Sequence, residues 1–134
     1  MGNFADDVQA FVHQAERNMD LVVRKIALEM FTKVVLRSPV DKGRFRANWQ
    51  VAIGTVPSGK LEIDDPTGVA TISKIEAAAL SLKAGDTIVL VNNLPYGPRL
   101  ENGHSQQAPA GMVGLTVQEF GDVVRKAGLE LVQI

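Results

Sequence analysis

Apolar side chains recur at alternating steps of three and four residues in the first part of the chain, and no glycine or proline occurs between Phe4 and Leu36. This spacing predicts an amphipathic α-helix. Pro39 restricts Ser38 to extended geometry, so the predicted long helix covers residues 1–37. Its apolar positions are Phe4, Val8, Phe11, Ala15, Met19, Val22, Ile26, Met30 and Val34.

The length of this helix has a consequence for the shape of the protein. About 33 helical residues span roughly 50 Å, whereas a compact domain of 134 residues has a diameter of roughly 36 Å. A straight helix would therefore protrude from its own core and carry Phe4, Val8 and Phe11 outside it. These three side chains are candidates for a partner interface. A kink or a frayed first turn is the alternative.

The middle of the chain shows strand and loop patterns. Residues 47–56 alternate in polarity and predict a strand with Trp49, Val51 and Ile53 on one face. Residues 57–68 combine prolines, glycines and acidic side chains, so they predict a long polar loop that could hide further short strands. Loops of this length inside a compact domain are usually functional or mobile, and the charged residues of this loop are candidates for a partner interface. These are Lys60, Glu62, Asp64 and Asp65.

The second half adds two helices and a strand. Residues 71–84 predict a short helix with a capping box at Ser73 and Glu76, and residues 86–91 predict a central strand. Thr116 and Glu119 suggest a second capping box, opening a helix through Leu131. The pattern predicts an α+β protein of one domain, residues 1–134, with an antiparallel sheet of about four strands. The apolar stripe of the last helix is Val117, Phe120, Val124, Ala127 and Leu131.

Composition narrows the class of protein. Hydrophobic residues make up 46% and charged residues 22%, and cysteine is absent. These values are typical of a globular domain, with neither a disulfide framework nor a thiolate metal site. No apolar run reaches the roughly 20 residues that cross a bilayer, so no membrane contact is expected. The net charge of −1 gives no broad basic footprint for nucleic acid, and a cytoplasmic setting is the default.

Two short motifs suggest hydrolytic chemistry. Asp41-Lys42-Gly43 resembles the turn of an aspartic protease, but that reaction needs two carboxylates sharing a proton, and Lys42 would place a cation beside them. A turn set by Asp41, with a positive φ at Gly43, is the better interpretation. Glu101, His104 and Ser105 lie close in sequence and form a hydrolase alternative. A single histidine there is weak evidence for zinc, and we assign no catalytic, cofactor or metal site.

Basic side chains surround Phe45. Lys42, Arg44 and Arg46 form a small patch that could contact DNA, which makes a DNA-binding packaging accessory protein another alternative. The favoured interpretation pairs one of the arginines with Glu101 or with an acidic residue of a neighbouring chain.

Two segments of the chain together resemble a family of tailed-phage virion proteins. These are the small neck and tail-completion proteins, often described as minor tail proteins and akin to the lambda tail protein Z group. Lys42 and Gly97 depart from the family pattern, which has threonine and alanine there. The first matching segment contributes Ser38, Pro39, Val40, Asp41, Gly43, Phe45, Arg46 and Trp49. The second contributes Asn92, Asn93, Tyr96, Leu100, Glu101, Gly103, Ser105, Gln107, Ala108, Pro109 and Gly111.

The resemblance implies a non-enzymatic structural protein of a phage or prophage. It implies a ring at the head–tail junction through which DNA passes, with a hexamer as one option. The partners would be further copies of the chain and adjoining neck or tail proteins, with at most transient contact with DNA. The location would be the virion neck or tail, and the host cytoplasm during assembly. The residues expected to join the two segments are Asp41, Gly43, Tyr96, Glu101 and Gly103, with Arg46 paired to Glu101.

Overall fold

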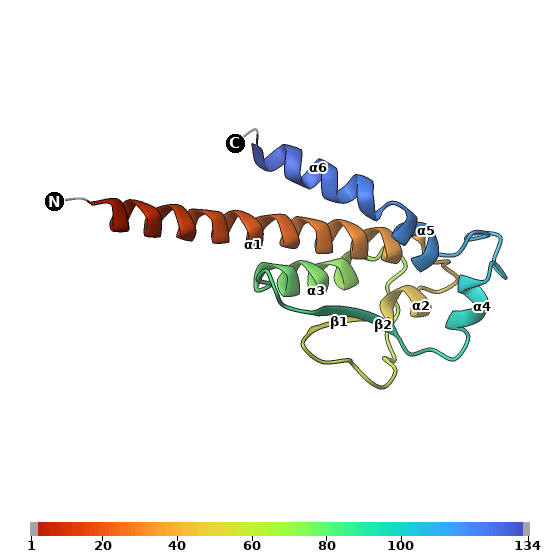
Figure 1. The fold of residues 1–134 in the computed structure, drawn as a ribbon. Helices are drawn as coiled ribbons and strands as arrows, with labels where there is room; N and C mark the ends of the chain where they lie inside the picture. Colours follow the sequence, from red (N-terminus) through yellow and green to blue (C-terminus); the bar gives the residue numbers. More distant parts are fainter. Residues whose placement is uncertain (1–2, 133–134) are drawn as a thin grey trace.

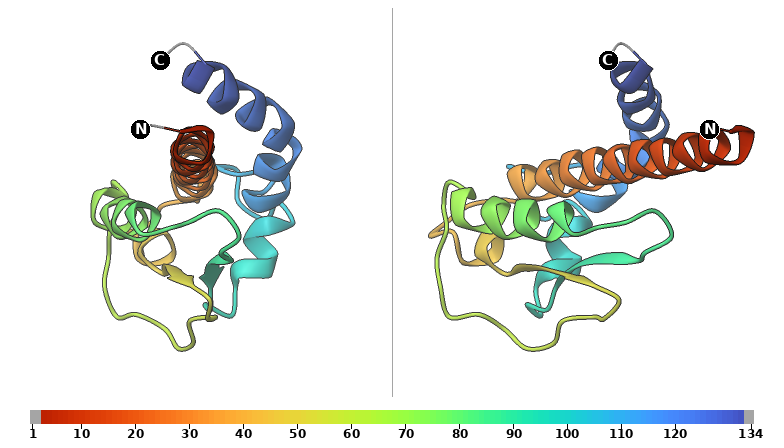
Figure 2. Two further views of the ribbon diagram at one scale, coloured as in Figure 1. Left: turned by 60° about the vertical axis from the view of Figure 1, so that its left-hand side comes forward. Right: turned by 90° about the vertical axis from the view of Figure 1, so that its left-hand side faces the viewer.

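The computed structural model describes residues 3–132 and shows one long helix with the rest of the chain gathered around its C-terminal half (Figure 1). A second helix and a small sheet pack on one side of this long helix, and the last helix crosses it on the other side (Figure 2). The elements in order are α1 (Phe4–Arg37), α2 (Arg44–Ala47), β1 (Trp49–Ile53), α3 (Val69–Leu80), β2 (Ile88–Asn92), α4 (Gly97–Glu101), α5 (Val113–Gln118) and α6 (Phe120–Val132).

The α+β class and the long first helix are confirmed, but the prediction of about four strands is wrong. Within residues 3–132 the sheet has two antiparallel strands, with register from Trp49↔Asn92 to Ile53↔Ile88. The polar loop adds no strand, because side chains of other residues form the hydrogen bonds of its backbone that a neighbouring strand would otherwise make. Asn48 donates through Nδ2 to Leu61 O (3.1 Å) and accepts from Leu61 N (2.7 Å), while Gln50 donates to Gly59 O.

Two helix starts also differ from the sequence expectation. Residues 44–47 form the helical turn α2, so β1 begins at Trp49 and not at residue 47. Helix α3 begins at Val69, which places Ser73 inside the helix and excludes the expected capping box. The buried carboxylate of Asp65 takes over that role, because its Oδ2 accepts bonds from Thr71 N (2.8 Å) and Thr71 Oγ1 (2.7 Å).

The expected single helix from residue 116 is two helices that meet at Glu119. Thr116 lies within α5, and its hydroxyl donates to Met112 O (2.7 Å), so it forms no capping box. The predicted apolar stripe is wrong in part. Val117 and Phe120 are exposed, while Val123 and Ala127 are buried; the side chain of Leu131 lies outside the described residues.

The hydrophobic core lies against the C-terminal half of α1. Only Val34 of the predicted helix stripe joins it, because the buried face of α1 is rotated toward Ala27 and Val35. Trp49 closes this end of the core, where its Nε1 donates to Ser38 Oγ (2.7 Å). The core cluster is Val34, Val35, Phe45, Trp49, Ile75, Leu94, Ala108 and Met112. Within the described residues, no helix is both long and apolar enough to cross a membrane.

Candidate functional site

The two turn-rich segments, residues 38–49 and 92–111, pack directly against each other. The side-chain amide of Gln107 makes a paired contact with Val40: its Oε1 accepts from Val40 N (2.8 Å) and its Nε2 donates to Val40 O (2.9 Å). Asn92 Nδ2 donates to Phe45 O (2.9 Å), and the rings of Phe45 and Tyr96 lie 5.8 Å apart. The segments therefore form one joint, which we call the turn joint.

Gly43 and Gly103 were expected to join the two segments, but their close approaches lie elsewhere: Gly43 meets the polar loop, and Gly103 meets Pro109 of its own segment. Gly43 has φ +94°, and a Cβ there would overlap the backbone nitrogen of Pro66 and lie 2.7 Å from the carbonyl carbon of Asp65. Gly43 O also accepts from Asp65 N (2.9 Å). Gly103 has φ +87°, and its Cβ would overlap the carbonyl oxygen of Pro109. Side chains are excluded at both positions by neighbouring backbone, which is the hardest kind of steric limit to relieve.

The expected pair between Arg46 and Glu101 is wrong, because each side chain is used elsewhere. Arg46 donates to Pro66 O (2.9 Å) and to the carbonyls of Leu36 (3.0 Å) and Ser38 (2.8 Å), where α1 ends. The carboxylate of Glu101 accepts backbone bonds at the start of α5. Its three donors are Met112 N (3.0 Å), Val113 N (2.9 Å) and Gly114 N (2.8 Å).

The electrostatics of Glu101 reflect those bonds. Burial alone would raise the pKa of Glu101, but the bonds from Gly114, Val113 and Met112 outweigh it and hold the pKa below its ordinary value. The carboxylate is therefore ionised at neutral pH and is committed to the backbone of the next element.

A polar cleft of about 530 Å³ opens beside the turn joint. Its lining includes Asp41, Lys42 and Arg44 from one segment and Tyr96 from the other. Arg44 lies 3.2 Å from Glu62 and 3.6 Å from Asp64 of the polar loop. Asp41 is exposed, and no hydrogen bond to its carboxylate occurs among residues 3–132, so its expected role in setting the turn is not seen.

The loop residues proposed for a partner interface do not share one environment. Lys60, Glu62 and Asp64 are exposed, whereas Asp65 is only 7% exposed and is bonded to Thr71. Asp65 is therefore a structural residue of the loop, and its prediction as a surface residue for a partner is wrong. The bonds of its carboxylate to the start of α3 hold its pKa below the ordinary value, although burial alone would raise it.

The hydrolase alternative gains no geometric support. Both oxygens of Glu101 already accept backbone bonds, and Ser105 Oγ accepts from Gln107 N (3.1 Å). His104 is exposed, and no hydrogen bond joins it to Glu101 or Ser105 in the described chain. Over the same residues, no group of three histidine or acidic side chains is placed to hold a metal ion.

Most basic side chains of the patch around Phe45 already have partners within the chain. Arg44 faces two acidic side chains and Arg46 binds carbonyls, which leaves Lys42 exposed on the turn. A phosphate-binding surface needs several cations that point outward together. The structure instead commits two of the three cations, Arg44 and Arg46, to different partners.

The other candidate surface is the N-terminal part of α1, residues 4–19, which we call the overhang. Figures 1 and 2 show it extending past the ends of α3 and α6. Directly after the overhang, the carboxylate of Asp20 accepts a hydrogen bond from Ala84 N (2.8 Å), which joins α1 to the rest of the domain. The exposed apolar side chains of the overhang are Phe4 (82%), Val8 (42%), Phe11 (74%), Val12 (43%) and Met19 (59%).

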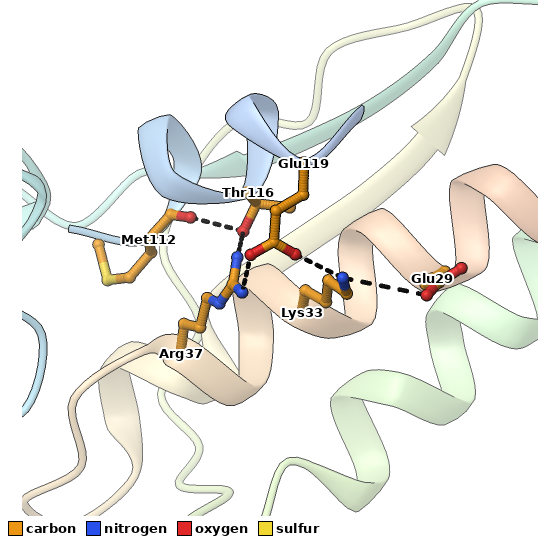
Figure 3. Close-up of polar contacts among 6 residues, drawn as sticks. All are labelled: Glu29, Lys33, Arg37, Met112, Thr116 and Glu119. Atoms are coloured by element: carbon orange, nitrogen blue, oxygen red, sulfur yellow. Dashed lines mark hydrogen bonds and ion pairs between the residues drawn. The ribbon is translucent and has the colours of Figure 1, made fainter. Parts of the chain in front are cut away.

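Beyond the overhang, α5 and α6 lie over later turns of α1. Glu119, between α5 and α6, binds both Lys33 and Arg37 of α1, and Arg37 also donates to Thr116 Oγ1 (2.8 Å) (Figure 3). The bonds from Lys33 and Arg37 lower the pKa of Glu119. Sequence reasoning missed this cluster because it assigned Glu119 to a capping box.

No protein-family model, curated protein or solved structure was found to match this chain.

Proposed function

We propose that this protein is a structural assembly component of a phage or prophage neck, in which several copies form a ring around the path of the DNA. The observation that carries the assembly role is the overhang, with Phe4 82% and Phe11 74% exposed on a regular helix. The neck assignment rests on the resemblance of residues 38–49 and 92–111 to neck and tail-completion proteins. The packing of these two segments into one joint supports it.

The overhang favours association on energetic grounds. Burying a large apolar side chain contributes about 1.5–3 kcal/mol, so Phe4, Val8 and Phe11 together offer a substantial driving force. The helix itself is already formed and begins with a cap, because Asn3 Oδ1 accepts from Asp6 N (2.9 Å). Less conformational entropy is therefore lost on docking than for a disordered arm.

Charge also supports a conduit for DNA over a DNA clamp. The chain carries 14 basic and 15 acidic residues, and Arg44 faces Glu62 and Asp64. A ring that bound phosphates strongly would hold the DNA that has to pass through it.

The assembly role is tested by the double substitution Phe4→Lys with Phe11→Lys. Lysine is a good helix former, and both sites are exposed, so the free energy of unfolding should change by less than about 0.5 kcal/mol per site. We expect oligomers of the wild-type chain in native mass spectrometry at rising concentration, and loss of those oligomers in the variant.

The matched control is Val56→Lys, since Val56 is 68% exposed in the polar loop, away from the overhang. It should assemble like the wild type. A wild-type chain that stays monomeric at every concentration would overturn the assembly role.

The neck role is tested in the phage that encodes the chain. Removing the protein should leave DNA-filled heads and finished tails unjoined in electron micrographs, and supplying it should restore whole particles. Normal particles without the protein would exclude a neck component while leaving the assembly result untouched.

A further inference from the structure

A second apolar strip lies on the body of the molecule, along the paired helices α1 and α3. On α1, Leu21 (45% exposed), Leu28 and Leu36 (50% exposed) recur at helical spacing. On α3, Val69 (66%), Ile72 and Leu80 (75%) do the same. A helix of a globular protein usually turns such a face toward its core. Here Leu28 and Ile72 pack partly against the core, as do the buried residues of α3. Leu21, Leu36, Val69 and Leu80 remain exposed.

The two strips run side by side because α3 is antiparallel to α1. At one end a Cβ on Gly68 would lie 3.2 Å from a side-chain carbon of Val35, and at the other Arg24 Nε donates to Leu82 O (2.7 Å). Between them lies a groove of about 470 Å³, which we call the α1–α3 groove. Its lining includes Leu28, Thr32 and Ile72, with Ala127 of α6 at one side.

On the basis of the proposed assembly role, we propose that the α1–α3 groove receives the overhang of a second copy. Lengths agree: the overhang from Phe4 to Met19 and the α1 strip from Leu21 to Leu36 each span about 22 Å of helix. Laying an amphipathic helix in an apolar groove is a common recognition mode, with anchors at helical spacing. Phe4, Val8 and Phe11 supply such anchors.

Charge favours this arrangement over pairing of two overhangs. The overhang carries Asp6, Asp7 and Glu16 against a single arginine, Arg17. Two overhangs side by side would therefore bring like charges together. The groove is less acidic than the overhang, because its remaining lysines and glutamates balance once Lys33 is paired with Glu119. The charged lining residues are Lys25, Lys33, Lys126, Glu29 and Glu76.

The contact is heterologous, since the overhang and the groove are different parts of the same molecule. Each copy donates one overhang and accepts another, so association continues from copy to copy until the ring closes. The groove thereby specifies a second copy as the partner and a head-to-tail arrangement of the copies.

Cysteine cross-linking tests the arrangement cleanly because the chain contains no cysteine. Ala15→Cys labels the apolar stripe of the overhang and Thr32→Cys labels the groove, both as near-isosteric changes. A short bismaleimide should link the two single variants when they are mixed and give little dimer with either alone. The variant carrying both cysteines should give a ladder of multimers.

A surface substitution gives an independent reading. Leu80→Lys places a charge in the strip at an exposed site near the end of α3, where a cation suits the helix dipole. We expect the fold to be kept and association to weaken by about tenfold or more. The control is Leu129→Lys on α6, also exposed (58%) but outside the strip, which should associate like the wild type.

The outcomes separate this inference from the proposed function. The Ala15→Cys variant alone could form oligomers and cross-link to the same extent as the mixture of the two single variants. That result would mean that overhangs pair with each other, and it would exclude the groove as the docking site. Full association of the Leu80→Lys variant would exclude it as well. A wild-type chain that never associates would overturn both the groove and the assembly role.

Discussion

Gly43 shows how one residue determines the path of two distant segments. Its carbonyl accepts from Asp65 N, and its Cα faces the backbone of Asp65 and Pro66 with no room for a side chain. The positive φ and the close approach of the loop backbone therefore both exclude a Cβ at this position. The sequence alone indicated the positive φ, but the approach of the loop backbone depends on contacts that only the folded chain brings together.

Comparing Gly43→Ala with Gly85→Ala separates these two effects. Both glycines have nearly the same φ, +94° and +95°, but a Cβ on Gly85 meets nothing within 4 Å. We expect Gly85→Ala to cost about 1 kcal/mol from backbone strain alone. Gly43→Ala should cost about 3 kcal/mol or more, because backbone atoms must also move.

Urea unfolding followed by fluorescence of the single tryptophan, the buried Trp49, measures both values. Equal losses for the two variants would show that the approach of Pro66 is not a constraint.

Helix α5 begins where a carboxylate from another element binds its first N–H groups. Glu101, at the end of α4, accepts from Met112, Val113 and Gly114, so one charged side chain joins two short helices. The first N–H groups of a helix have no partner within it, and an anionic acceptor also suits the helix dipole. Neither short helix has a side-chain cap of its own.

Glu101→Gln should lower the free energy of unfolding at neutral pH by about 1–2 kcal/mol. The amide would turn an NH₂ group toward backbone donors that now face an oxygen. Because the folded pKa of Glu101 is lowered, its contribution is complete above the ordinary pKa of 4.5 and is lost as the pH falls through the folded value. The variant should therefore lose less stability than the wild type on acidification.

Unfolding curves at neutral pH and at about pH 4 test this difference. Glu16→Gln is the control, since Glu16 is exposed and has no hydrogen bond among the described residues. An identical acid response in the wild type and Glu101→Gln would contradict the capping role.

How far each element could be predicted depends on where its stabilising contacts lie. The long helix α1 is encoded locally, by a periodic run without glycine or proline, and was predicted closely. The strands β1 and β2 were predicted within two or three residues by their alternation and apolar content. The missing strands and the α5–α6 break depend on distant partners. Asn48 bonds the loop at Leu61, and Glu119 binds Lys33 and Arg37.

The same distinction holds for the candidate sites. Exposure of Phe4, Val8 and Phe11 follows from helix length against domain size, and the sequence supplies both quantities. The partners of Arg46 and Glu101 could not be predicted from the sequence. A charged side chain can bind the free carbonyls or N–H groups at a helix end as readily as it binds a side chain of opposite charge. The α1–α3 groove was missed because the stripe chosen on α1 was not the face that packs on the core.

The whole molecule consists of one long helix with a compact body around its C-terminal half. This shape places the overhang and the α1–α3 groove on different parts of the molecule. In Figure 1 the overhang continues along α1 into the part of the helix that packs on α3, and residues 25–33 of that part line the groove. If copies join in this way, each contact has the same geometry and adds the same rotation. Closure then makes the last contact intramolecular, which raises its effective concentration and stabilises the ring over open chains.

This argument predicts how the mass distribution changes with concentration. A closed ring should appear as one stoichiometry that replaces monomer over a narrow concentration range and then stops growing, because no groove is left empty. An open chain would instead lengthen as the concentration rises. Native mass spectrometry across a concentration series distinguishes the two, and adding Leu80→Lys chains sharpens the test. Such a chain still offers an overhang but carries a charge in the apolar strip beside the groove, so it should convert the ring signal into short open oligomers. Oligomers that keep growing with concentration would show that the rotation does not close, which a neck ring requires.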